Sequence, residues 1–214
     1  MATVATPIAP PRNVAKYAIW ATLGIALVVA FIFTDYPLLF PSGDPYRAHL
    51  IADRFVLIPH AVFALIAMLI GPFQFSTRFR QRHLARHRLL GKIYVICIAF
   101  TAPAAIWLGF HSEAVEGLSM TMATLALGVG WLVCTLVAFL TARNRHIAVH
   151  RQWMVRSYCF TLNFIFARVL NYWPAYTHLS NTGFANVLWG LTFCYLLLPD
   201  LYFNWREITT SRAK

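Results

Sequence analysis

Long apolar segments dominate this chain of 214 residues and limit what it can fold into. A helix needs about 20 consecutive, mostly apolar residues to cross the hydrocarbon core of a bilayer. Hydrophobic residues make up 59% of the chain and charged residues only 12%, whereas a soluble domain usually carries about twice that charged fraction. Six segments have the required length and composition: 14–33, 55–75, 90–110, 118–141, 153–173 and 184–203. The sequence therefore predicts an all-α integral membrane protein with six transmembrane helices.

The first apolar segment lacks the small-residue cleavage pattern of a signal peptide, so we expect it to be the first membrane span. The six spans then form a single transmembrane domain at 14–205. A short N-terminal tail, 1–13, precedes this domain, and a C-terminal tail, 206–214, follows it.

Basic residues are distributed unevenly between the connections. The chain has 18 Lys and Arg against 7 Asp and Glu, a formal net charge of +11. Fifteen of the 18 basic residues lie near the N-terminus, around the loops after the second and fourth spans, or after the sixth span. Five of the seven acidic residues lie in the other loops, on the opposite side of the membrane. Because basic loops stay in the cytoplasm, we expect both termini to be cytoplasmic. We interpret the charge as a signal of topology and of contact with anionic lipids on that face, not of nucleic-acid binding.

The four inner spans each carry small and polar residues on one face, whereas the first and sixth spans are apolar around most of their circumference. In membranes, small and polar faces pack against neighbouring helices, and uniformly apolar helices face lipid. The sequence predicts a bundle of spans two to five with spans one and six outside it. The polar residues on the inner faces are His60, Gln74, Tyr94, Thr101, Thr121, Thr135, Ser157, Thr161 and Arg168.

An internal repeat joins the two basic loops. Residues 80–88 align without gaps to residues 143–151, and six of the nine positions are identical. Each copy forms the cytoplasmic turn of an outside-in-outside hairpin, so the two copies share one orientation. This arrangement predicts two parallel repeats related by an axis along the membrane normal.

Histidines in the repeat suggest a cofactor site. His87 and His150 each begin a span that enters the bundle. Two imidazoles from facing helices at the same depth are a natural axial pair for a haem iron. Arg88 and Arg151 follow directly, and a guanidinium group binds a haem propionate in a bidentate manner. These four residues are the predicted haem b site.

A copper or zinc site is the alternative use of these histidines. His83 and His146 lie four residues before His87 and His150, so each pair shares one face if its segment is helical. Four imidazoles from the two loops would suit either metal. We expect the weaker ligands to be His83 and His146.

Two ionisable residues lie within spans, His60 on the second and Arg168 on the fifth, each about five residues from the outer end. A charge inside a membrane is costly and usually functional, so Arg168 is the residue to test first. Pro59 and Pro72 interrupt the second span, and broken helices of this kind often line a cavity. The pattern favours a polar pocket between His60 and Arg168.

The combined motifs resemble a bacterial family of predicted membrane proteins, domain-of-unknown-function family 2306. The strings that carry the resemblance are Gly71-Pro72-Phe73-Gln74-Phe75, HRLLGKIY at 87–94 and HRQWMVRSY at 150–158, and the resemblance covers 55–173. It implies a multi-pass protein of the bacterial cytoplasmic membrane. Its typical polar set here is His60, His87, His150, Arg151, Arg156 and Arg168, without His83 or His146. A looser similarity is to transmembrane b-type cytochromes, which are four-helix bundles with inward histidines.

Two functions of different classes remain open. The first is a membrane redox protein that holds haem b and exchanges electrons with quinone or a partner protein. The alternative is a non-enzymatic membrane protein. It would be a small-solute or proton-linked carrier, or an assembly or structural subunit of a respiratory complex. In either case His60 and Arg168 would line its polar pocket. Hydrolysis is disfavoured because the inner spans contain no carboxylate and the chain has no hydrolase motif. An enzymatic role would be that of a membrane oxidoreductase.

Overall fold

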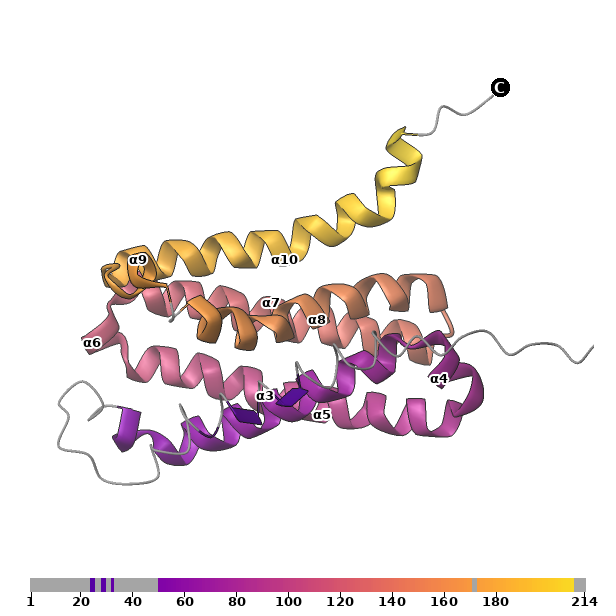
Figure 1. Ribbon diagram of the computed structural model, residues 1–214, viewed down its shortest axis with the longest axis horizontal. Coiled ribbons are helices and arrows are strands. Elements are labelled where there is room, and N and C mark those ends of the chain that lie inside the picture. Colours follow the sequence, from indigo (N-terminus) through magenta and orange to yellow (C-terminus); the bar gives the residue numbers. More distant parts are fainter. Residues whose placement is uncertain (1–23, 26–27, 30–31, 33–49, 171–172, 210–214) are drawn as a thin grey trace, which may run out of the picture.

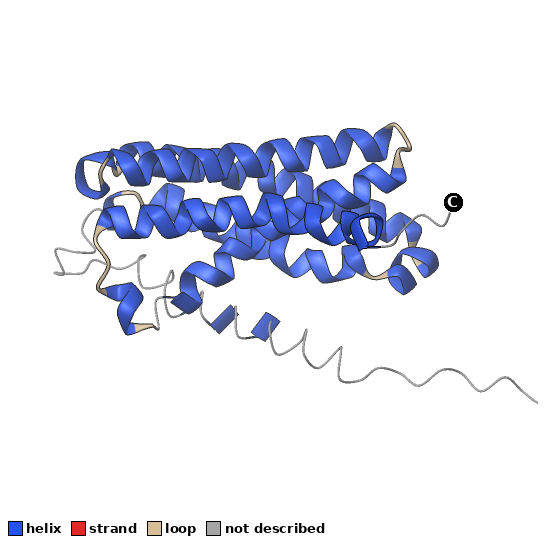
Figure 2. Cartoon of the chain, turned by 90° about the horizontal axis from the view of Figure 1, so that it is seen from above, coloured by secondary structure: helices blue, strands red, loops and turns tan. Residues whose placement is uncertain are grey.

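The computed structural model describes residues 24–25, 28–29, 32, 50–170 and 173–209, and within these ranges the chain is helical with no strand (Figures 1 and 2). The predicted first span, 14–33, lies outside the described residues except at five positions. The helices are α3 (Arg54–Phe75), α4 (Thr77–Arg82), α5 (Leu84–His111), α6 (Glu113–Glu116), α7 (Leu118–Arg143), α8 (Ile147–Leu170), α9 (Pro174–Thr177) and α10 (Asn181–Thr209).

Five long helices cover the second to sixth predicted spans. Four of them, α3, α5, α7 and α10, are long and apolar enough to cross a membrane. The fifth, α8, has 24 residues but is not among these four, because Arg156, Ser157 and Asn163 interrupt its apolar sequence. The chain is therefore a membrane protein with several transmembrane helices, as predicted.

The long helices run antiparallel along the chain. Figure 1 shows α4 and the turn between α7 and α8 at one end of the bundle, and α6 and α9 at the opposite end. The first end carries both copies of the basic repeat and is called the basic end below. The second carries Asp53, Glu113 and Glu116 and is called the acidic end. The structure thus places the two basic loops together, as the charge distribution predicts, and the cytoplasmic location of that end stays a prediction.

The predicted inner faces are buried. Tyr94, Thr101, Thr121, Thr135, Ser157 and Thr161 are each at most 3% exposed. The most extensive helix contacts are those between α3 and α5, between α7 and α8, and between α5 and α7. Small and hydroxyl-bearing residues therefore line the helix interfaces, as expected for packing within a membrane.

The helix α10 lies at the side of the bundle, where it packs against α7 and α8. This agrees with the prediction of an inner bundle of spans two to five with the sixth span outside it. Ala185, Thr192 and Tyr195 of α10 are buried, and the Tyr195 ring meets that of Phe160 edge to face at 5.4 Å. One small and aromatic face of α10 thus covers α7 and α8, while most of its circumference stays exposed.

The two repeat copies fold alike only in their second halves. The His87 amide donates to the carbonyl of His83, and the His150 amide donates to that of His146, each at 2.9 Å, so α5 and α8 begin in the same way. The first halves differ, because residues 80–82 belong to α4 whereas residues 144–145 form a turn in which Arg145 has a φ of 63°. Tyr94 and Ser157, which are 63 residues apart like the copies themselves, are in contact through their hydroxyl groups. A parallel repeat stays a prediction.

Candidate functional site: a cavity inside the helix bundle

His60 is fixed on α3 by the neighbouring helix α5. Its Nδ1 lies 2.8 Å from the carbonyl oxygen of Thr101, and because a carbonyl only accepts, this nitrogen carries a hydrogen. The Thr101 hydroxyl donates in return to the His60 carbonyl at 2.6 Å. The first bond fixes the ring orientation and places a hydrogen on Nδ1, and the second ties the α3 backbone to α5.

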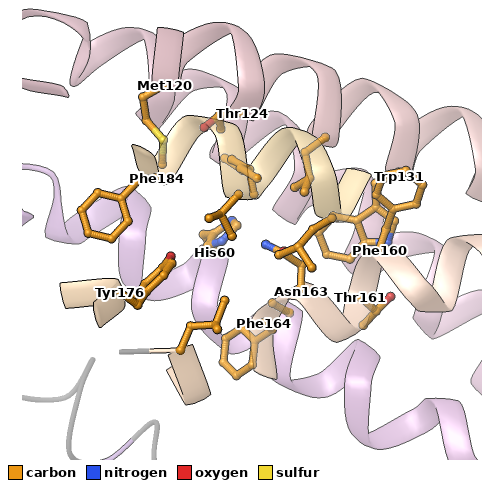
Figure 3. Close-up of a pocket in the computed structure, with 17 residues that line it drawn as sticks. His60, Met120, Thr124, Trp131, Phe160, Thr161, Asn163, Phe164, Tyr176 and Phe184 are labelled. Atoms are coloured by element: carbon orange, nitrogen blue, oxygen red, sulfur yellow. The ribbon is translucent and has the colours of Figure 1, made fainter. Parts of the chain in front are cut away.

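A cavity of about 270 Å³ lies beside His60 and is bounded by residues of α3, α5, α7, α8, α9 and α10 (Figure 3). Its wall is mainly aliphatic and aromatic. The polar side chains among the described residues that line it are His60, Thr124, Trp131, Thr161, Asn163 and Tyr176, and none of these lining residues is a carboxylate.

Trp131 and Asn163 provide polar atoms on the cavity wall. Trp131 is 5% exposed, and its buried Nε1 lies beside the Tyr94 hydroxyl. The Asn163 carboxamide is oriented by the Tyr195 hydroxyl, which donates to its Oδ1 at 3.1 Å. Figure 3 shows the Asn163 amide nitrogen pointing towards His60. The cavity thus offers hydrogen-bond donors in an otherwise apolar space.

A second hollow of about 200 Å³ connects His60 with the acidic end. It shares His60, Ala105 and Thr124 with the cavity, and its wall includes Asp53 and Glu116. The carboxylate of Asp53 lies 3.3 Å from His111 Nε2. His60 therefore stands between an acidic hollow and an apolar cavity.

Four buried hydroxyl groups adjoin the cavity on the side of the basic end. Tyr94 Oη lies 2.7 Å from Thr161 Oγ1 and 2.9 Å from Ser157 Oγ. Ser157 Oγ lies 2.7 Å from Thr135 Oγ1 in turn. Thr161 lines the cavity, so this hydroxyl chain begins at the cavity wall and leads away from it through α5, α8 and α7.

His87 and His150 come together at the basic end. His150 Nδ1 lies 2.8 Å from the carbonyl of Ala138 and therefore carries a hydrogen. His87 lies close enough to His150 for their charges to interact. The Nδ1 atom of His87 is buried and has no hydrogen-bond partner among the described residues. Gln74 donates to the His87 carbonyl at 3.2 Å. The structure thus brings together two of the predicted ligands.

The remaining predicted ligands of this site lie on the surface. The side chains of His83, Arg88, His146 and Arg151 are exposed. In the part of the chain that the structure describes, no group of three or more His, Cys, Asp or Glu side chains is placed to hold a metal ion. The four-histidine copper or zinc site therefore has no support from the structure, and the haem b site stays a prediction.

Arg156 has a partner that the sequence analysis missed. Its guanidinium group is buried and forms an ion pair with Asp200 of α10, and it lies 4.8 Å from the centre of the Trp153 ring. Asp200 lies three residues before the end of the sixth predicted span, and Arg156 lies three residues after the start of the fifth. Matching the depths of opposite charges would therefore have found the pair. The side chain of Arg168 lies outside what the structure describes, and its predicted place beside His60 stays a prediction.

The fold and the buried polar residues define a multi-pass helical membrane protein. The family described as Predicted membrane protein (DUF2306) matches residues 57–203, and the chain belongs to this family. The match corrects the narrower resemblance over 55–173, because it includes most of α10, the helix that packs against α7 and α8. No curated protein and no solved structure matches the chain.

Proposed function

We propose that this protein binds a small, neutral, lipophilic molecule of the quinone type in the cavity beside His60, as a carrier or binding protein of the membrane. The observation that carries this proposal is the cavity itself. Packed protein interiors contain few voids larger than a water molecule, whereas this one has a volume of about 270 Å³. Apolar walls with a few convergent polar groups are typical of small-molecule sites.

The chemistry of the wall indicates the class of ligand. A cation would need a carboxylate in this low-dielectric environment, and none of the described lining residues supplies one. The Asn163 amide nitrogen points into the cavity towards His60, and a carbonyl oxygen of the ligand would accept a hydrogen bond from it. A quinone ring is flat, uncharged and carries carbonyl oxygens on opposite edges, so it matches both the apolar walls and the donors.

Cavity-filling substitution tests the proposal. Ala105 of α5 lines the cavity, whereas Ala99 of the same helix is exposed on the outside of the bundle. A decyl-substituted benzoquinone is titrated into lipid nanodiscs that contain the protein, and tryptophan fluorescence reports binding. We expect saturable quenching for the wild type, and Kd at least about tenfold higher for Ala105→Phe because the phenyl ring occupies the site.

The Ala99→Phe variant is the matched control, because it adds the same side chain to the same helix on the lipid-facing side. It should bind the quinone as the wild type does. Equal binding by the Ala105→Phe and Ala99→Phe variants, or the lack of a saturable component in the wild type, would contradict the proposal.

Haem b binding at the basic end is the second candidate. Its support is that His150 donates through Nδ1 to the Ala138 carbonyl, which leaves Nε2 to bind iron, as is usual for histidine ligands. His87 contributes the second imidazole, and a bound haem would supply one-electron redox chemistry. A visible spectrum and iron analysis of protein produced with added haem test this candidate. A Soret band that disappears in the His150→Ala variant supports it, and a spectrum without a Soret band rejects it.

A further inference from the structure

Polar groups that can accept and release a proton follow one another along the bundle. At the acidic end, the hollow lined by Asp53 and Glu116 leads to His60. His60 and Thr161 then both line the cavity. The cavity has room for several water molecules, each of which takes about 30 Å³, and its polar side chains supply the partners that such waters need.

Beyond the cavity, the hydroxyl chain continues towards the basic end. The Thr161 hydroxyl oxygen lies 2.7 Å from that of Tyr94, which lies 2.9 Å from that of Ser157. The Ser157 oxygen lies 2.7 Å from that of Thr135. A hydroxyl group both donates and accepts. A proton can therefore enter at one oxygen while each hydroxyl releases its own hydrogen to the next, and no group keeps a charge after the transfer.

The two terminal hydroxyl groups of this chain also bond to backbone carbonyls. Thr161 donates to the Ser157 carbonyl at 3.1 Å, and Thr135 donates to the Trp131 carbonyl at 2.8 Å. Both hydroxyl groups must therefore turn when a proton passes. Thr135 lies eight residues before Arg143, where α7 ends at the basic end, an axial rise of about 12 Å.

We propose that these groups form a proton-transfer path along the bundle, from the acidic hollow through His60, the cavity water and the hydroxyl chain of Thr161, Tyr94, Ser157 and Thr135 towards the basic end. The path does not rest on the proposed quinone ligand, because water in the empty cavity is sufficient for it. A ligand in the cavity would displace that water and interrupt proton transfer. The same space would thus serve ligand binding and proton transfer in turn.

Proton flux into vesicles tests the path. The full chain is reconstituted into phosphatidylcholine vesicles that contain a pH-sensitive dye, and a potassium gradient with valinomycin drives proton entry. We expect flux above that of protein-free vesicles. In Tyr94→Phe the central hydroxyl is lost while the ring remains, and flux should fall about tenfold or more, which corresponds to ~1.4 kcal/mol in the barrier.

Tyr158→Phe is the matched control, since the Tyr158 hydroxyl is also buried but donates to the Met68 carbonyl, outside the path. This variant should keep the wild-type flux. Thr135→Val, which has nearly the same shape as the wild type, repeats the test at a second position should Tyr94→Phe fail to fold. Wild-type flux no greater than that of empty vesicles, or equal flux in the Tyr94→Phe and Tyr158→Phe variants, would overturn the path. Failure of quinone binding would leave the expected flux unchanged, so the two proposals fail separately.

Discussion

Replacing Gly71 with alanine tests how closely α3 and α8 are packed. A Cβ atom at this position would lie 2.7 Å from Cδ2 of Tyr158 and closer still to Cε2 and Cζ, whereas real Cβ atoms essentially never come within 3.0 Å of a neighbour. The Tyr158 ring has little freedom to move away. It is 7% exposed, its hydroxyl donates to the Met68 carbonyl at 3.0 Å, and it contacts the Phe75 ring at 5.2 Å.

The expected cost follows from these contacts. Forcing an extra carbon into a packed core costs about 1–3 kcal/mol. Displacement of Tyr158 also breaks its hydrogen bond to Met68, worth about 0.6 kcal/mol within a membrane. Alanine gains up to ~1 kcal/mol over glycine in helix propensity. The free energy of unfolding should therefore fall by about 0.6–2.6 kcal/mol in the Gly71→Ala variant.

Unfolding in mixed dodecylmaltoside and SDS micelles, followed by circular dichroism, measures this change. Gly190→Ala on α10 is the control, because nothing lies within 4 Å of the added carbon, and it should be as stable as the wild type or more so. The Tyr158→Leu substitution removes the ring that the new carbon would meet. In that background, Gly71→Ala should lower the free energy of unfolding by less than it does in the wild type. If the free energy of unfolding of Gly71→Ala equals that of Gly190→Ala, the close packing of α3 against α8 is contradicted.

Three further substitutions probe other contacts. Asp200→Ala should lower the free energy of unfolding by about 1–3 kcal/mol, because Arg156 remains buried without its carboxylate; a loss no larger than that of an exposed surface substitution would refute the pairing. Thr101→Val removes the hydroxyl that donates to the His60 carbonyl and should cost about 1 kcal/mol in the same assay, and unchanged stability would show that this bond contributes nothing. Asn163→Leu removes the amide nitrogen that points into the cavity and keeps a side chain of similar size, so quinone binding should weaken about tenfold; unchanged Kd would argue against a ligand contact at Asn163.

The sequence was sufficient to locate the long helices and their buried faces. Apolar segments of membrane-spanning length coincide with α3, α5, α7, α8 and α10 because hydropathy and helix length are local properties. Burial of Tyr94, Ser157 and Thr161 was predictable for a similar reason, since their spacing along each helix fixes which residues share a face.

Contacts between helices could not be derived in this way. The bond between His60 and Thr101 joins residues 41 apart, and the ion pair of Arg156 and Asp200 joins residues 44 apart. Both depend on how each helix is rotated and on which helix is its neighbour. The face by which α10 packs against α7 and α8 was not predicted either, because an apolar circumference is compatible with both lipid and protein contact.

Extraction of the purified protein tests the central claim, an occupied ligand site beside His60, most directly. Wild type, Ala105→Phe and Ala99→Phe are purified under the same conditions, extracted with organic solvent and analysed by mass spectrometry. A neutral lipophilic compound bearing carbonyl oxygens should accompany the wild type and Ala99→Phe in comparable amounts and be depleted from Ala105→Phe. The same compounds in the same amounts in all three extracts would contradict the account.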